Sequence, residues 1–150
     1  MSVETVVSMS GDEQPENLAF DGDGNLYFGL TSGGLHRLAR DRLGSSHTLA
    51  DTEQIATLPE TTGVEVGDDG TVYVAVPTDT EQGGIWEVPP DGEAAQLATI
   101  GGFPNGVFAD GDRLLVTESF DGTVFAVGTD GSTSTWLDAD RLDPTRFGAN

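Results

Sequence analysis

A degenerate phrase recurs along this chain and constrains its fold more than any other feature. Its copies lie at Gln14–Gly29, Thr61–Ala75 and Phe103–Thr117, and the opening of a fourth lies at Phe147–Asn150. Matching Leu18, Val64 and Val107 gives steps of 46 and 43 residues. Each copy joins two short β-prone runs through a glycine turn. A repeat of this length made of short strands is typical of a β-propeller blade.

Further short β-prone runs and glycine turns fill the intervals between the copies, so the chain is predicted to be all-β. We expect about three four-stranded antiparallel blades, at residues 14–58, 61–100 and 103–138, with the start of a fourth at 147–150. A single strand at 4–9 is expected ahead of them. In the first blade, the strands are predicted at 16–20, 25–30, 34–38 and 48–58, the last one interrupted.

Three blades do not close a ring, because propellers have 4–8 blades. An open arc leaves an apolar blade face exposed at each end. Two arrangements would cover these faces: either the 150 residues are the front half of a longer chain, or two copies form a homodimer that completes the ring. The first is favoured, since residues 147–150 of one copy would compete with Glu16 of the other for the same place.

The charge of the chain narrows the choice of partners. Against 26 Asp and Glu there are only six basic residues, all of them Arg, and the formal net charge is −20. Such a surface repels nucleic acid and anionic lipid, so we expect neither nucleic acid nor a membrane as a partner. The acidic residues are spread over the whole length. This pattern is typical of proteins from salt-loving organisms, and an ordinary acidic protein is the alternative.

Features of export and of membrane insertion are also missing from the sequence. There is no cysteine, which excludes disulfides and thiolate metal sites. Residues 1–6 have neither the basic nor the apolar region of a signal peptide. No apolar run reaches the roughly 18 residues that would cross a bilayer. We therefore expect a soluble, cytoplasmic protein.

One repeated position is the best candidate for a functional site. The innermost strands of a propeller line its central channel, so residues at a matched position of successive blades meet around the axis. Two residues before the matched apolar position stand Glu16, Thr62 and Asn105, and Asn150 takes the equivalent place in the fourth copy. Carboxylate, amide and hydroxyl oxygens suit a hard cation such as Ca²⁺ or Mg²⁺. The alternative is that these side chains bond the backbone of neighbouring turns.

The phrases that begin Pro15-Glu-Asn-Leu-Ala-Phe and Phe103-Pro-Asn-Gly-Val-Phe resemble the senescence marker protein/gluconolactonase family. The resemblance implies half of a six-bladed propeller and metal-dependent hydrolysis of a sugar lactone, a small-molecule substrate. It also implies that Glu16 and Asn150 bind a divalent metal, Ca²⁺ first and Zn²⁺, Mn²⁺ or Mg²⁺ as alternatives. Asn105 would face the substrate, and we place Thr62 beside it as a second substrate-binding candidate.

The same resemblance leaves the predicted site incomplete. The family's metal-binding Asp, which is also its candidate base, would lie beyond Asn150, so no catalytic residue is assigned. We therefore expect this chain to be a truncated or weakly active form. The repeated phrase is also similar to those of NHL-type, strictosidine-synthase-like and streptogramin-lyase propellers. A non-catalytic NHL-type propeller that binds a protein or a ligand is accordingly the main alternative, and lyase chemistry ranks below it.

Overall fold

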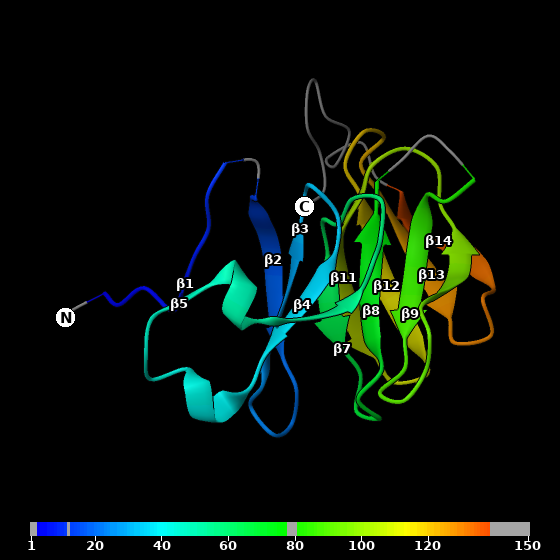
Figure 1. Cartoon of the computed structure of the whole chain (residues 1–150). Coiled ribbons are helices and arrows are strands. Elements are labelled where there is room, and N and C mark those ends of the chain that lie inside the picture. The colour runs from blue at the N-terminus through cyan, green and yellow to red at the C-terminus, as the bar shows by residue number, and fades with distance from the viewer. Residues whose placement is uncertain (1–2, 12, 78–80, 139–150) are drawn as a thin grey trace.

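The fold consists almost entirely of antiparallel β-sheet, as the sequence predicts. The structure is a computed structural model, and it describes residues 3–11, 13–77 and 81–138. Three four-stranded sheets lie next to one another in chain order (Figure 1). We call them blades 1, 2 and 3 in chain order. Residues 147–150, predicted to open a fourth blade, lie outside the described part of the chain.

Each blade runs from an innermost strand to an outermost strand in chain order. Blade 1 contains β2 (Pro15–Phe20), β3 (Leu26–Leu30), β4 (Leu35–Leu38) and β6 (Glu53–Ala56). Blade 2 contains β7 (Val64–Val66), β8 (Val72–Val76), β9 (Gly84–Val88) and β10 (Ala95–Thr99). Blade 3 contains β11 (Pro104–Asp110), β12 (Arg113–Glu118), β13 (Thr123–Gly128) and β14 (Thr133–Asp138). The innermost strands are neighbours, because β7 contacts both β2 and β11.

The turn between β2 and β3 shows how the repeated phrase fixes its hairpin. Gly24 has φ +83°, a left-handed conformation that favours glycine. The Asp21 carboxylate accepts hydrogen bonds from the backbone N–H groups of Asp23 at 3.0 Å and Asn25 at 2.8 Å. It also accepts hydrogen bonds from the Asn25 side-chain amide at 2.7 Å and from the Tyr27 hydroxyl at 3.1 Å. Burial raises the pKa of Asp21, but these bonds outweigh that effect and its pKa lies below the ordinary value.

The segment between β4 and β6 departs from the predicted interrupted strand at 48–58. Only β6 pairs with β4 in the blade, whereas β5 (His47–Thr48) pairs in parallel with β1 (Val7–Ser8) outside it. Two short 3₁₀ helices, η1 (Arg40–Arg42) and η2 (Leu49–Asp51), turn the chain. A capping box between Thr48 and Asp51 stabilises the second turn. The strand predicted at 4–9 is reduced to the two residues of β1.

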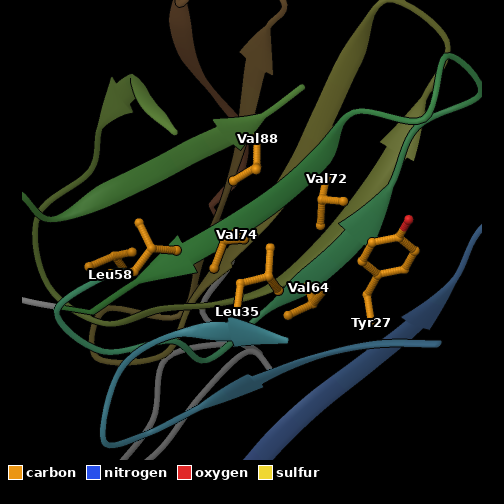
Figure 2. Packing of buried hydrophobic residues seen from close by; sticks show 8 residues of the cluster. Tyr27, Leu35, Leu58, Val64, Val72, Val74 and Val88 are labelled. Atoms are coloured by element: carbon orange, nitrogen blue, oxygen red, sulfur yellow. The ribbon is translucent and has the colours of Figure 1, made fainter. Parts of the chain in front are cut away.

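The core lies between the blades rather than within one sheet. Tyr27 and Leu35 of blade 1 pack against Val64, Val72 and Val74 of blade 2 (Figure 2). All five residues of β8 are buried, because blade 2 has a blade on each side, and this explains its continuous apolar sequence. Burying one such Val or Leu side chain stabilises the fold by about 1.5–3 kcal/mol. Packing between neighbouring blades therefore holds the arc together.

Blade 3 packs on blade 2 in the same manner. Ile85 and Ala75 of blade 2 lie in one cluster with Leu114, Val116 and Val127 of blade 3. The helices in the described ranges are three-residue 3₁₀ turns, and none there is long and apolar enough to cross a membrane.

Candidate functional site

The candidate position coincides with a β-bulge in the innermost strand of blade 1. Pro15 pairs with Leu30 and Leu18 pairs with Phe28, so Glu16 and Asn17 together lie opposite Gly29. A bulge of two residues against one changes the direction in which side chains point, and such bulges are frequent next to active sites.

The same irregularity recurs in the other two blades. In blade 3, Pro104 pairs with Glu118 and Val107 with Val116, which leaves Asn105 and its neighbour opposite a single residue. In blade 2, the Thr62 N–H donates to the Ala75 carbonyl at 3.0 Å, and the Ala75 N–H donates to the carbonyl of the following Gly63 at 2.9 Å. Glu16, Thr62 and Asn105 therefore occupy one structural position in three adjacent blades, on β2, just ahead of β7 and on β11, as the repeat predicts.

Glu16 is the accessible member of this set. It is exposed, and its carboxylate accepts no hydrogen bond from the residues that the structure describes. Its neighbour Asn17 uses its side-chain oxygen to accept the N–H of Leu18 at 2.7 Å, which fixes the bulge. The carboxylate of Glu16 is therefore available to a cation or to a proton donor.

Thr62 and Asn105 are placed differently from Glu16. Thr62 is 2% exposed, and its hydroxyl donates to the Pro104 carbonyl of blade 3 at 2.8 Å. Asn105 is 5% exposed, and its amide nitrogen contacts the Ser119 hydroxyl at 3.5 Å. The Thr62 hydroxyl thus bonds a backbone carbonyl, whereas the Asn105 amide contacts another side chain, and the role of both residues in substrate binding stays a prediction.

The described residues alone do not make a metal site. Glu16 contributes a single carboxylate, and no three His, Asp or Glu side chains gather within residues 3–11, 13–77 and 81–138. Asn150, the second predicted ligand, lies outside these ranges. A divalent metal would need oxygen donors beyond those that Glu16 supplies.

A buried carboxylate that the sequence reasoning missed lies at the end of β12. Glu118 is 2% exposed, and its two oxygens accept the backbone N–H groups of Phe103 at 2.7 Å, Phe120 at 2.8 Å and Asp121 at 2.6 Å. Gly102 leaves room for it, because a Cβ there would lie 2.5 Å from the carboxylate oxygen Oε1. Its three backbone bonds make Glu118 a residue that fixes the loops beside Asn105.

A Ser–His contact near the N-terminal strand pair is not a nucleophile pair. The Ser45 hydroxyl lies 3.0 Å from Nε2 of His47, and the Arg42 guanidinium lies 3.2 Å from its Nδ1. Since arginine only donates, Nδ1 must accept, and Nε2 then carries the proton. That nitrogen cannot take a proton from Ser45, so this cluster is structural.

A polar groove of about 520 Å³ lies between blades 1 and 2, lined among others by Tyr27, Arg37 and Glu53. Arg37 and Glu53 form an ion pair at 3.3 Å. Burial and the bond to Asp21 raise the pKa of Tyr27. Because these charged groups are already paired, the groove offers less than Glu16 to a ligand.

Comparisons with known proteins agree with this fold. Residues 2–38 match the family model for the N-terminal part of strictosidine synthase-like proteins. No curated protein matches the chain. The gluconolactonase resemblance therefore stays a prediction.

Solved structures extend the likeness to the whole arc. A virginiamycin B lyase from Staphylococcus aureus is 16% identical with a TM-score of 0.68, and the alignment covers 87% of this chain and 44% of the lyase. A chain of the nidogen/laminin complex is 18% identical with a TM-score of 0.69, covering 88% of this chain and 51% of that one. The computationally designed Ika4 protein is 16% identical with a TM-score of 0.57, covering 98% of this chain and 84% of Ika4.

These likenesses establish the fold alone: the chain consists of β-propeller blades. It spans about half the length of the two natural propellers it matches.

Proposed function

We propose that these blades belong to a propeller hydrolase which, with its ring complete, opens a sugar lactone or a related ester at the channel mouth. The observation that carries the proposal is the exposed carboxylate of Glu16, which accepts no hydrogen bond from the described residues and lies at a bulge position that recurs in all three blades. A divalent metal, Ca²⁺ first, would be held there by Glu16 and by donors outside the described residues. The 150-residue chain by itself is expected to be inactive or very weak.

The chemistry open to Glu16 follows from its surroundings. An exposed carboxylate can bind a cation or accept a proton from water, but one group does not do both at once. The Thr62 hydroxyl would contact a substrate only after leaving the Pro104 carbonyl, and Asn105 is only 5% exposed. The proposal therefore gives Glu16 the principal role and leaves the positioning of the substrate to the completed ring.

Calcium titration by calorimetry tests the part of the proposal that concerns this chain. We compare the wild type with Glu16→Gln and with Glu93→Gln, an equal change of charge at an exposed site in an outer loop of blade 2. Stoichiometric binding that Glu16→Gln abolishes and Glu93→Gln retains supports the proposal. Equal binding by all three proteins would refute it, because the cation would then be held by the acidic surface in general.

A lactone hydrolysis assay with added Ca²⁺, Mn²⁺ or Zn²⁺ tests the chemical part. We expect little or no turnover by the 150-residue chain. Appreciable turnover that is lost in Glu16→Gln would confirm hydrolysis and would show that the chain is sufficient by itself.

A non-catalytic propeller that binds a protein or ligand, of the NHL type, is the second candidate. It is supported by the inward contacts of Thr62 and Asn105, which leave Glu16 as the accessible side chain among the described members of the candidate position. One solved relative comes from a complex of nidogen with laminin. No calcium uptake at millimolar concentration, together with no effect of Glu16→Ala, would favour this function over hydrolysis.

A further inference from the structure

Neighbouring blades in this arc meet through two different faces. We call the face that a blade turns to the following blade its leading face, and the face that it turns to the preceding blade its trailing face. Tyr27 on the leading face of blade 1 packs with Val64 and Val72 on the trailing face of blade 2. Tyr73 on the leading face of blade 2 packs with Leu114 and Val116 on the trailing face of blade 3. Both interfaces are therefore of one type.

Within the residues that the structure describes, one face of this type has no neighbouring blade at each end of the arc. On the trailing face of blade 1, Leu18 is 59% exposed and Phe20 is 54% exposed, whereas Val64, the equivalent of Leu18 in blade 2, is 3% exposed. On the leading face of blade 3, Phe108 is 59% exposed and Leu137 is 39% exposed. Side chains of this size are usually covered when they lie together on one face of a sheet.

The trailing face of blade 1 is only partly covered by the N-terminal segment. Val6, Val7 and Met9 pack over Leu26 and Phe28 but leave Leu18 exposed. In Figure 1 the strand pair β1–β5 lies to the outer side of blade 1, away from blades 2 and 3. Between this cover and the innermost strand is a cavity of about 370 Å³, lined mainly by apolar side chains, with Glu16 and Asn17 also in its wall.

We propose that a second copy of this chain covers the exposed part of both faces, with blade 3 of each copy packed on the uncovered β2 side chains Leu18 and Phe20 of the other around a two-fold axis. Register supports this choice of occupant. Phe108 follows Val107 as Ala19 follows Leu18, and Ala19 lies in the interface between blades 1 and 2. The aromatic ring of Phe108 is thereby directed at the innermost strand of a following blade. In the dimer that strand is β2 of the second copy, where Leu18 and the cavity stand exposed.

Such a dimer would change the surroundings of Glu16. Because innermost strands of neighbouring blades lie side by side, β11 of the second copy would take the free side of β2. Glu16 would then have Thr62 of its own chain on one side and Asn105 of the second copy on the other. The proposal rests on packing alone and is independent of the proposed activity. It requires that β2 of the second copy, and not residues 147–150 of the same chain, takes the place next to β11.

Charge determines the conditions under which the dimer forms. Each chain carries a formal net charge of −20, so two copies repel one another. The Debye length falls from about 10 Å at 0.1 M salt to about 3 Å at 1 M, which removes most of that repulsion. The burial of apolar faces should therefore dominate in molar KCl, and the dimer should dissociate as salt is removed.

Light scattering after size-exclusion chromatography in molar KCl tests the proposal with two single variants, Leu18→Asp and Phe108→Asp. We expect the wild type to have twice the chain mass of 15.7 kDa, and each variant alone to be a monomer. An equimolar mixture of the two variants should recover a dimer, because one of its two interfaces then joins an unchanged Phe108 to an unchanged Leu18. The control is Ala95→Asp, at an exposed position of β10, the outermost strand of blade 2, and it should remain a dimer.

Each other outcome contradicts the proposal. A monomeric wild type in molar KCl would mean that no second copy covers these faces. A dimer that Phe108→Asp disrupts and Leu18→Asp does not would indicate blade 3 packed on blade 3. Larger assemblies would indicate an open chain of copies instead of a closed ring. Circular dichroism of each variant must match the wild type, so that a loss of mass is not a loss of folding.

Discussion

Glu118 is the residue whose replacement most directly tests how the loops around Asn105 are held. The residue is 2% exposed, and its carboxylate accepts hydrogen bonds from three backbone N–H groups, those of Phe103, Phe120 and Asp121. The rings of Phe103 and Phe120 lie 5.3 Å apart, so the carboxylate fixes two loops that also contact each other. Glu118→Gln keeps the size of the side chain and changes only what it can accept.

The expected loss follows from counting those bonds. A hydrogen bond to a charged group contributes about 1.5–3 kcal/mol, and a buried donor left without a partner costs about 1–3 kcal/mol. The amide oxygen of Gln can replace Oε1 and keep the N–H groups of Phe103 and Phe120, but its NH₂ group then faces the N–H of Asp121. We expect Glu118→Gln to lower the free energy of unfolding by about 2–4 kcal/mol, and Glu118→Ala to lower it further.

Urea titration followed by circular dichroism in molar KCl measures this loss, and Glu93→Gln serves as the control. The control removes the same negative charge at an exposed position and should change the free energy by less than about 0.5 kcal/mol. Amide hydrogen exchange should be fastest at Asp121 in Glu118→Gln. A variant as stable as the control, with unchanged exchange at Asp121, would refute the view that the carboxylate holds these loops.

Three further predictions concern blade packing, pH and salt. Gly63→Ala would place a Cβ 1.9 Å from the carbonyl oxygen of Asn105, so we expect a loss of about 2 kcal/mol or more in urea, while Gly44→Ala, with nothing within 4 Å, serves as the control. Burial next to Phe28 lowers the pKa of His36 below its ordinary value of 6.5, an effect that Glu13 partly offsets. The unfolded chain therefore binds the proton first, so stability should be full above pH 6.5 and decline below it, less steeply in His36→Gln. Molar KCl should raise the melting temperature by screening the net charge; an equal rise in sucrose of matched osmolality would argue against screening.

The arrangement of strands could largely be predicted from the sequence, because the same turn recurs with the same spacing. The continuous apolar run of β8 is consistent with a strand buried on both faces, and the structure buries all five of its residues. The path of residues 39–52 was less predictable. There the polar connection includes η1 and η2 and places β5 beside β1, a pairing between segments about forty residues apart that no local pattern indicates.

The burial of Glu118 could have been predicted from the alternation of residues along β12. Along β12 the buried positions are Leu114, Val116 and Glu118, so a carboxylate occupies a place in the alternation that should be apolar. A buried carboxylate must find hydrogen-bond donors, and the glycine at 102 marks where another segment approaches it closely. The sequence could not indicate which donors these are, because all three are backbone N–H groups, which every residue except proline carries.

The different placement of Glu16 and Thr62 follows from what each side chain can donate. Thr62 bridges blades 2 and 3, because its hydroxyl donates to the Pro104 carbonyl. The carbonyl equivalent to that of Pro104 at the interface between blades 1 and 2 belongs to Thr61, and an ionised carboxylate at position 16 has no proton to donate to it. Glu16 is exposed instead, and the Thr61 hydroxyl ties blade 2 to blade 1 by donating to the Leu30 carbonyl at 2.9 Å. With a carboxylate at this bulge, blade 1 therefore lacks the hydrogen bond to the next blade that the Thr62 hydroxyl makes, and the Glu16 oxygens accept no hydrogen bond from the described residues. For this reason the position carries the proposed site in blade 1 and a structural contact in blade 2.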